Sequence, residues 1–290
     1  MRLAFLGTPA AAVPTLRALV AAGHDVAMVV TRPDRRRGRG AAVSHSDVQV
    51  AAQELGLRVG HAVGDLADVD VERGVVVAYG ALVPAAVLAR TPMLNVHFSL
   101  LPRWRGAAPV ERAILAGDEE TGVSVMSLEA TLDTGPIHLV RRVSVDEKRA
   151  SELTAELADV GAQALVDVLA SPALLEHPTP QEGEVTYADK LRAETFHLEP
   201  SMSVDEFSRV VRLERGFTIL SARRLRVLEV QRVDEAIEAG RVGLAGGVLA
   251  LGVRDGAVAL RVVQAEGGRP VDGYAWWQGA RLNVASARWA

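Results

Sequence analysis

Three polar side chains stand two residues apart in NVHFSLLPRWRGAAP, residues 95–109. They are Asn95, His97 and Ser99. Residues two apart on a β-strand project from one face, so a strand here presents an amide, an imidazole and a hydroxyl together. An amide N–H can stabilise a developing oxyanion, and histidine is well suited to move a proton near neutral pH. The spacing therefore indicates acid–base chemistry at a strand end, although a buried polar cluster would show the same pattern.

A carboxylate that could assist the histidine occurs in TLDTGPI, where Asp133 lies in a loop between two expected strands. A carboxylate beside an imidazole can orient it and raise its basicity. Asp-Thr-Gly is also an ordinary turn sequence, so Asp133 alone is weak support for a site. Pro102 ends the strand that carries His97, and Gly106 permits the backbone to turn sharply after it.

Apolar strands alternate with helices along the first part of the chain. Strands are predicted over RLAFLG, DVAMVVT, GVVVAYG and MLNVHFS. Such strands, separated by helices, indicate a mostly parallel sheet covered on both faces, which is a doubly wound, Rossmann-like α/β fold. Ligands of these sheets bind at the carboxyl ends of the strands, which is where Asn95, His97 and Ser99 lie.

The pattern changes towards the end of the chain, and we expect two domains. The first is predicted over residues 1–172. Proline, glycine and charged residues then gather, and residues 173–200 are predicted to be a linker. Short β-like runs follow, and the Asp255-Gly256 pair between two of them is a strong hairpin signal. Residues 201–290 are therefore expected to form a small β-rich domain, a candidate barrel.

Composition excludes several classes of protein. The chain has 290 residues, no cysteine and a net charge of −4. Disulfides, thiolate zinc sites and a cysteine nucleophile are therefore excluded, and a uniformly basic nucleic-acid binder is disfavoured. No apolar run reaches the length of a membrane span and the start lacks a secretory signal, so we expect a cytoplasmic protein with no membrane partner.

Several familiar site motifs are absent from the sequence. The first strand is not followed by G-x-G-x-x-G, which argues against a nucleotide-dependent oxidoreductase. The sequence also lacks a P-loop, an H-E-x-x-H motif and a G-x-S-x-G serine elbow. The histidines other than His97 show no ligand spacing, so no metal is expected.

Arginines gather in two segments. TRPDRRRGRG, residues 31–40, holds five arginines and one aspartate, and it follows a strand at the same rim as His97. Most charge runs are solvated loops, but an arm that contacts nucleic-acid phosphates is the sharper interpretation. A second group lies at the start of the β-rich domain and consists of Arg209, Arg212, Arg215, Arg223, Arg224 and Arg226.

Taken together, these segments resemble the folate-dependent formyltransferases, most closely the members that act on methionyl-tRNA. The motifs are FLGTP, TRPDRRRGRG, VVAYGALVP, NVHFSLLPRWRGAAPVERAILAGDEETGVSVM, LDTGPI, TYADKL and the ending VVQAEGGRPVDGYAWWQGARL. The resemblance covers nearly the whole chain and is thinnest between residues 192 and 255. It implies an amino-terminal formyltransferase domain and a carboxyl-terminal tRNA-binding barrel of the OB type.

The resemblance also implies a reaction. 10-Formyltetrahydrofolate would donate its formyl group to the α-amino group of methionine carried by initiator tRNA, and we expect a monomer. Asn95, His97 and Asp133 match the family's catalytic residues. Asn95 and protonated His97 would stabilise the tetrahedral intermediate, and Asp133 would orient His97. The family's folate-contacting loop matches Ser99, Leu100, Leu101 and Pro102.

In the family, the loop that matches residues 31–40 enters the acceptor stem and helps to select the initiator tRNA. Arg39 is the principal candidate for that role. The full set of candidate tRNA-binding residues is Arg36, Arg37, Arg39, Arg223 and Arg224. The chain departs from the family pattern in potential tRNA and packing contacts, at Ala41, Ala42, Gly268 and residues 212–219.

Two alternatives within the family stay open. A formyltransferase for an amino sugar nucleotide or another small amine would use the same chemistry, but it would not need the arginine loop. A non-catalytic folate- or RNA-binding relative would not need to retain asparagine, histidine and aspartate together.

Overall fold

Residues 1–37, 42–282 and 287–289 are described in a computed structural model of the chain. The chain divides into two compact units. The first unit consists of Met1–Val110, Glu119–Ser144 and Leu153–Asp189. The second unit consists of Glu111–Asp118, Val145–Glu152 and Lys190–Ala290.

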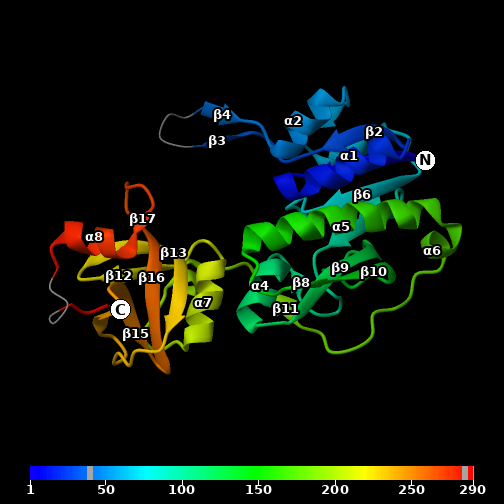
Figure 1. Cartoon of the computed structure of the whole chain (residues 1–290). Helices are drawn as coiled ribbons and strands as arrows, with labels where there is room; N and C mark the ends of the chain where they lie inside the picture. The colour runs from blue at the N-terminus through cyan, green and yellow to red at the C-terminus, as the bar shows by residue number, and fades with distance from the viewer. Residues whose placement is uncertain (38–41, 283–286, 290) are drawn as a thin grey trace. The chain divides into compact units, whose positions relative to one another are not determined.

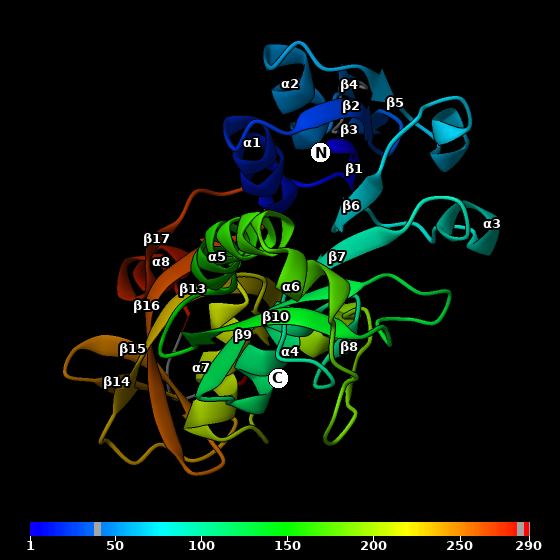
Figure 2. The same ribbon diagram turned by 90° about the vertical axis from the view of Figure 1, so that its right-hand side faces the viewer.

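The first unit is built on a seven-stranded sheet in the order β10-β9-β7-β6-β1-β2-β5 (Figure 1 and Figure 2). Its strands are β1 (Arg2–Gly7), β2 (Asp25–Val30), β5 (Val59–Gly60), β6 (Arg73–Val77), β7 (Met93–His97), β9 (Glu120–Ser127) and β10 (Ile137–Ser144). The neighbouring strands β7, β6, β1, β2 and β5 run parallel to one another. The β7–β9 and β9–β10 pairs are antiparallel. The mostly parallel α/β sheet predicted from the apolar strands is confirmed.

Helices cover both faces of this sheet. They are α1 (Val13–Ala21), α2 (Asp47–Glu54), α3 (Ala85–Leu88), α5 (Ala150–Ala170), α6 (Pro172–Glu176) and the short 3-10 helices η1 (Ala10–Ala12) and η2 (Val63–Leu66). Figure 2 shows α5 and α3 on opposite sides of β6 and β7. A Cβ added at Gly161 of α5 would lie 2.7 Å from Val96 Cγ1, so α5 packs closely on β7. Because strand residues alternate, Val96 faces α5, and Asn95 and His97 project from the other face.

Two short strand pairs lie outside the main sheet. β3 (Arg35–Arg37) and β4 (Ala42–Ser44) form an antiparallel pair within the arginine segment. β8 (Arg105–Gly106), in the turn after β7, pairs in parallel with β11 (Tyr187–Ala188). α4 (Pro109–Ala116) follows that turn. Residues 173–200, predicted to be a linker, contain most of α6, β11 and the 3-10 helix η3 (Ala193–Phe196).

The second unit is built on an antiparallel sheet in the order β12-β13-β16-β15-β14, with β17 paired to β16. Its strands are β12 (Phe217–Leu220), β13 (Arg223–Val233), β14 (Val242–Ala245), β15 (Val248–Val253), β16 (Gly256–Ala265) and β17 (Val271–Asp272). The core of the unit includes Phe207 from α7 (Val204–Arg212), Trp277 from α8 (Gly273–Ala280) and Trp289. The prediction that the last part of the chain is rich in β-strands is confirmed.

The hairpin predicted between two strands of this unit forms, but its turn lies one residue earlier than Asp255-Gly256. Val253 pairs with Gly256, which leaves Arg254 and Asp255 as the turn residues. The Asp255 carboxylate accepts a hydrogen bond of 2.8 Å from the backbone N–H of Val204, at the start of α7. This tertiary contact holds aspartate inside the turn, and local sequence does not reveal it. Among the described helices, none has both the length and the apolar composition needed to cross a membrane.

Candidate active site

β7 carries the asparagine and the histidine to the carboxyl end of the sheet, as predicted. Asn95 and His97 are 8% and 6% exposed. Asn95 makes no side-chain hydrogen bond to any residue in the described ranges, so its amide is available to a ligand. Neither polar atom of the Asn95 amide is among the fully buried atoms without a partner, so the amide can be reached by a ligand.

Asp133 lies beside His97, although 35 residues separate them in the sequence. Its Oδ2 atom is 3.7 Å from His97 Nδ1 and accepts a hydrogen bond of 2.8 Å from the backbone N–H of Gly106. Asp133 is 8% exposed and has a φ of +50°, a conformation that is uncommon outside glycine. The loop carboxylate and the strand imidazole therefore come together in a shielded site, where charge–charge interactions are weakly screened.

The tautomer of His97 follows from its second contact. Nε2 lies 2.9 Å from the carbonyl oxygen of Trp104. A carbonyl oxygen only accepts, so Nε2 carries a proton and donates it to this bond. In the neutral ring, Nδ1 is then the free base, and it faces the Asp133 carboxylate. A proton taken up at Nδ1 gives an imidazolium whose charge lies against that carboxylate.

The four predicted folate-contacting residues form the turn after β7. The hydroxyl of Ser99 is fully buried and donates to the Arg103 carbonyl at 2.5 Å. The backbone N–H of Leu101 donates to Ser124 Oγ, which in turn donates to the Ser99 carbonyl. Leu101 and Pro102 are buried and joined by a cis peptide bond, whereas Leu100 is partly exposed. The turn is therefore held by internal hydrogen bonds, and Ser99 uses its hydroxyl within it.

Several residues that organise this site were missed by sequence reasoning. Trp104 supplies the partner of His97, and Gln181 and Thr186 contact the catalytic loops from the segment taken as a linker. The TYADKL motif, which includes Thr186, was the one signal in the sequence, because it is part of the family resemblance. The residue types in this motif indicate no particular chemistry, so the sequence alone did not give Thr186 a role.

The predicted tRNA-binding arginines lie in both units. Arg36 and Arg37 belong to β3, where they pair with Val43 and Ala42 of β4. Arg39 lies outside the described residues. Arg223 and Arg224 are exposed at the start of β13, in the second unit.

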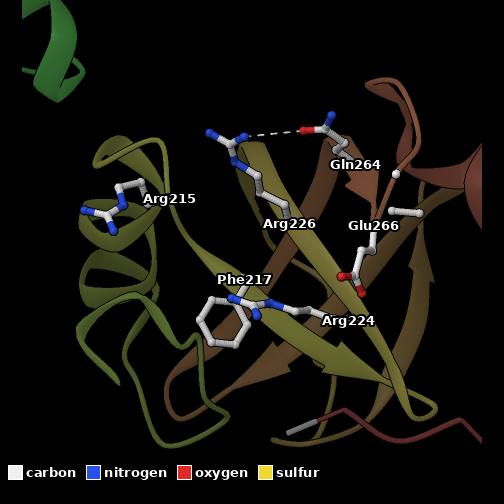
Figure 3. Close-up of a pocket in the computed structure, with 8 residues that line it drawn as sticks. Arg215, Phe217, Arg224, Arg226, Gln264 and Glu266 are labelled. Carbon is white, nitrogen blue, oxygen red and sulfur yellow. Dashed lines mark hydrogen bonds between the residues drawn. The ribbon is translucent and has the colours of Figure 1, made fainter. Parts of the chain in front are cut away.

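Arg224 also lines a pocket of about 310 Å³ within the second unit. Figure 3 shows Arg224 over the ring of Phe217, and the guanidinium carbon lies 3.9 Å from the ring centroid. Arg226 donates to Gln264 Oε1 at 3.4 Å on the opposite side of the pocket. Arg215 and Glu266 also line the pocket, so three guanidinium groups and one carboxylate gather here. Arginines held beside an aromatic ring are a common means of contacting RNA.

Comparison with known proteins identifies the family of the chain. Residues 1–169 match the family model described as formyl transferase. The chain is 43% identical to a methionyl-tRNA formyltransferase of Rhizorhabdus wittichii, over 92% of this chain and 91% of that protein. It is 44% identical to one of Novosphingobium aromaticivorans, over 93% of both chains.

Solved structures share the fold at low sequence identity. HypX from Aquifex aeolicus, in complex with tetrahydrofolic acid, matches 96% of this chain and 47% of its own length, with a TM-score of 0.65 and 18% identity. The N-formyltransferase from Helicobacter canadensis, in complex with folinic acid and dTDP-3-aminofucose, matches 89% of this chain and 98% of its own, with a TM-score of 0.65 and 13% identity. On the family model and the curated relatives, this chain belongs to the formyl transferase family and, within it, to the methionyl-tRNA formyltransferases.

Proposed function

We propose that this chain transfers the formyl group of 10-formyltetrahydrofolate to the α-amino group of methionine on initiator tRNA. The observation that carries the proposal is the buried His97–Asp133 pair beside Asn95, in a chain whose relatives are methionyl-tRNA formyltransferases over nearly its whole length. The unpartnered Asn95 amide fits a substrate that brings a carbonyl oxygen into this site.

In this reaction the methionyl amine attacks the formyl carbon, and the formyl oxygen becomes negatively charged. The Asn95 amide N–H and protonated His97 donate hydrogen bonds to that oxygen, and loss of one such donor costs about 10²–10³ in rate. The second N–H of charged His97 is on Nδ1, because Nε2 already donates to the Trp104 carbonyl, so Nδ1 is the donor to that oxygen. A new carbon–nitrogen bond forms to the amine, the bond from carbon to folate N10 breaks, and the proton lost by the amine passes to N10.

Asp133 acts on this chemistry through the histidine. Its Oδ2 atom lies 3.7 Å from Nδ1, and in this proposal the carboxylate orients the imidazole. The turn of Ser99, Leu100, Leu101 and Pro102 holds the folate, with Leu100 as its partly exposed side chain. No step in this mechanism needs a metal.

We divide the work between a catalytic domain at residues 1–172 and an OB-like, tRNA-binding domain at residues 201–290, joined by residues 173–200. The OB-like assignment is supported by closure of the antiparallel sheet. Leu220 at the end of β12 bridges to Trp289, and Arg241 beside β14 bridges to Arg288. The last residues of the chain thus contact both edges of the sheet, as expected of a partly closed barrel.

Initiator tRNA is recognised in this proposal by Arg36, Arg37 and Arg39 of the loop and by Arg223 and Arg224 of the second unit. The exposed side chains of Arg223 and Arg224 suit phosphate contacts, and the pocket beside Arg224 supports RNA contact there. The enzyme acts as a monomer in the cytoplasm, where charged initiator tRNA is used.

The decisive assay is formylation of methionyl-initiator-tRNA by the purified full chain with 10-formyltetrahydrofolate. We expect formylmethionyl-tRNA to form, and we expect methionyl-elongator-tRNA to react far more slowly. An amino sugar nucleotide serves as a parallel acceptor. Rapid formylation of the sugar with no reaction of charged tRNA would contradict the proposed acceptor. Folate binding with no transfer to either acceptor would contradict the proposed chemistry.

A further inference from the structure

A segment far from the catalytic motifs in sequence runs beside them in the first unit. Residues 179–188, here called the return segment, begin with Thr179, whose N–H and carbonyl both bond to the backbone of Ile137 at 2.8 and 2.7 Å. They end in β11, which pairs with β8 (Figure 1). The return segment therefore joins the strand after the Asp133 loop to the turn after His97.

The first side chain that it contributes is Gln181. Its Nε2 donates to the carbonyls of Asp133 and Gly135, both at 2.8 Å. Its Oε1 accepts from Nε and Nη2 of Arg105, at 3.1 and 2.6 Å. Both donor hydrogens and both acceptor positions of the amide are thus used. Asp133 has a φ of +50°, and a non-glycine residue in such a strained conformation needs surrounding contacts that fix it.

The second side chain is Thr186, which fixes the turn that holds His97. Thr186 Oγ1 accepts from the backbone N–H of Trp104 at 2.9 Å, and the Thr186 carbonyl accepts from the N–H of Arg105 at 2.9 Å. Trp104 also has a positive φ, of +63°. Its carbonyl is the partner of His97 Nε2, so Thr186 controls the orientation of the imidazole through one backbone unit.

The backbone of the return segment fixes the last part of the site. The carbonyl of Ala188 accepts from the N–H groups of Ala107 and Ala108, at 2.8 and 3.1 Å. These bonds set the peptide of Gly106, whose N–H donates to Asp133 Oδ2. The return segment thus fixes Asp133 from two sides, since Gln181 bonds to its backbone carbonyl and the Gly106 N–H bonds to its carboxylate.

We propose that the return segment is a positioning element of the active site, and that Gln181 and Thr186 are positioning residues for the Asp133–His97 pair. Both act through other groups and touch no reacting atom. The inference rests on the proposed formyl transfer for its effect on rate, but the geometry of the histidine is open to direct measurement.

The first test compares Gln181→Leu with Gln163→Leu. Gln163 is a matched control, because it is exposed on α5 and its amide donates to Asp167 Oδ1 at 2.9 Å. We expect Gln181→Leu to lower kcat about 10²-fold, since small misplacements of catalytic groups have effects of that size. KM for folate should change less than about twofold, while Gln163→Leu keeps parental kinetics. A Gln181→Leu enzyme with parental kcat, or with a loss confined to KM, would overturn the proposal.

The second test uses Thr186→Val and Thr186→Ser. Valine matches the shape of threonine but removes the acceptor for Trp104, and serine restores it. We expect the valine variant to lose kcat and the serine variant to recover most of it. Equal losses in the two variants would show that packing matters here rather than the hydrogen bond, and would overturn the assigned role of Thr186.

The third test is a spectroscopic measurement that does not depend on enzyme activity. In ¹⁵N spectra of the full chain with labelled histidine, the Nδ1 and Nε2 signals of His97 that report the Nε2–H tautomer should change in Gln181→Leu and in Thr186→Val. If the parent protein proves inactive on tRNA, the proposed function fails, yet altered His97 signals would still support positioning. Unchanged signals in both variants would overturn the positioning role even in an active enzyme.

Discussion

The strand-end site and the arginine pocket both concentrate charged groups, but they use them differently. His97 and Asp133 are less than a tenth exposed and are fixed by backbone contacts. Arg224 and Arg226 are exposed, and they rest on an aromatic ring and on hydrogen-bond acceptors at the surface. Salt screens exposed charges within about 8 Å at physiological ionic strength, whereas buried pairs are screened much less. The strand-end site therefore determines the reaction rate through the geometry of its groups. The arginine pocket contributes binding affinity, which salt can weaken.

The largest effects should come from the buried pair. We expect His97→Ala and Asp133→Asn to lower kcat by about 10²–10⁴, which is the usual contribution of general acid–base catalysis. Folate affinity should stay near the parental value, because neither side chain is assigned to the folate-holding turn. Single-turnover formylation and folate titration separate the two quantities. A kcat within threefold of the parent for both variants would remove the pair from the mechanism.

Gly106→Ala tests whether the buried site depends on its backbone. Gly106 has a φ of +126°, and an added Cβ would lie 2.8 Å from the Ala188 carbonyl oxygen. We expect a loss of about 1–3 kcal/mol in the free energy of unfolding, together with a fall in kcat, because β8 and β11 must separate. Urea unfolding and formylation rates measure the two effects.

Gly23→Ala is the matched control for that variant. Gly23 also has a positive φ, of +81°, but an added Cβ would have no atom within 4 Å. It should therefore lose stability from the backbone strain while keeping most of the parental kcat. If the two alanine variants lost kcat equally, backbone strain rather than the β8–β11 approach would explain the loss.

Much of the buried site could be predicted, because its signals are local. Apolar runs identified the strands, and the period of two placed Asn95 and His97 on one face at a strand end. The association of His97 with Asp133 needed the fold, since the sequence offered only a loop between two strands. The structure brings them to 3.7 Å.

The return segment could not be predicted, because its residues form contacts rather than a pattern. Proline, glycine and charge around Gln181 are typical of a linker, and the partners of Gln181 lie 46 to 76 residues away. The aromatic support of Arg224 was equally hidden, because Phe217 reaches it only through the pairing of β12 with β13. The distribution of charged residues identified the arginines. It did not indicate which arginine side chains are held by contacts with other residues.

The exposed region should respond to substitution through salt dependence. We expect Arg224→Gln to raise KM for tRNA modestly and to reduce the slope of log affinity against log salt by about one, the amount expected for one phosphate contact. Arg261→Gln is the control, because Arg261 is exposed on the neighbouring strand β16 and donates to Gln231. Formylation rates and tRNA binding at several salt concentrations test this. Equal slopes for the parent and Arg224→Gln would exclude a phosphate contact at Arg224.

The smallest expected effect is on the pH dependence of stability. It compares a buried titratable group, His138, with an exposed one, Glu206. His138 is buried, with Nδ1 donating to the Leu174 carbonyl at 2.9 Å and Nε2 accepting from Ser127 Oγ at 2.8 Å. Burial lowers the pKa of His138 below its ordinary value of 6.5. As pH falls, the His138 imidazole therefore becomes protonated in the unfolded chain before it does in the folded chain. The stability gained from neutral His138 is complete above about pH 6.5 and is lost as pH falls through the folded pKa.

Glu206 in the second unit gives the exposed counterpart. Its carboxylate accepts from the Ser203 N–H at 2.7 Å, and this hydrogen bond holds the pKa of Glu206 below 4.5. Its contribution is complete above about pH 4.5 and is lost only at lower pH. In urea unfolding at pH 7.5, 6.5 and 5.5, the stability difference between the parent and His138→Gln should therefore shrink, while the difference between the parent and Glu206→Gln stays constant. Parallel behaviour of the two variants would mean that burial of His138 does not govern its protonation.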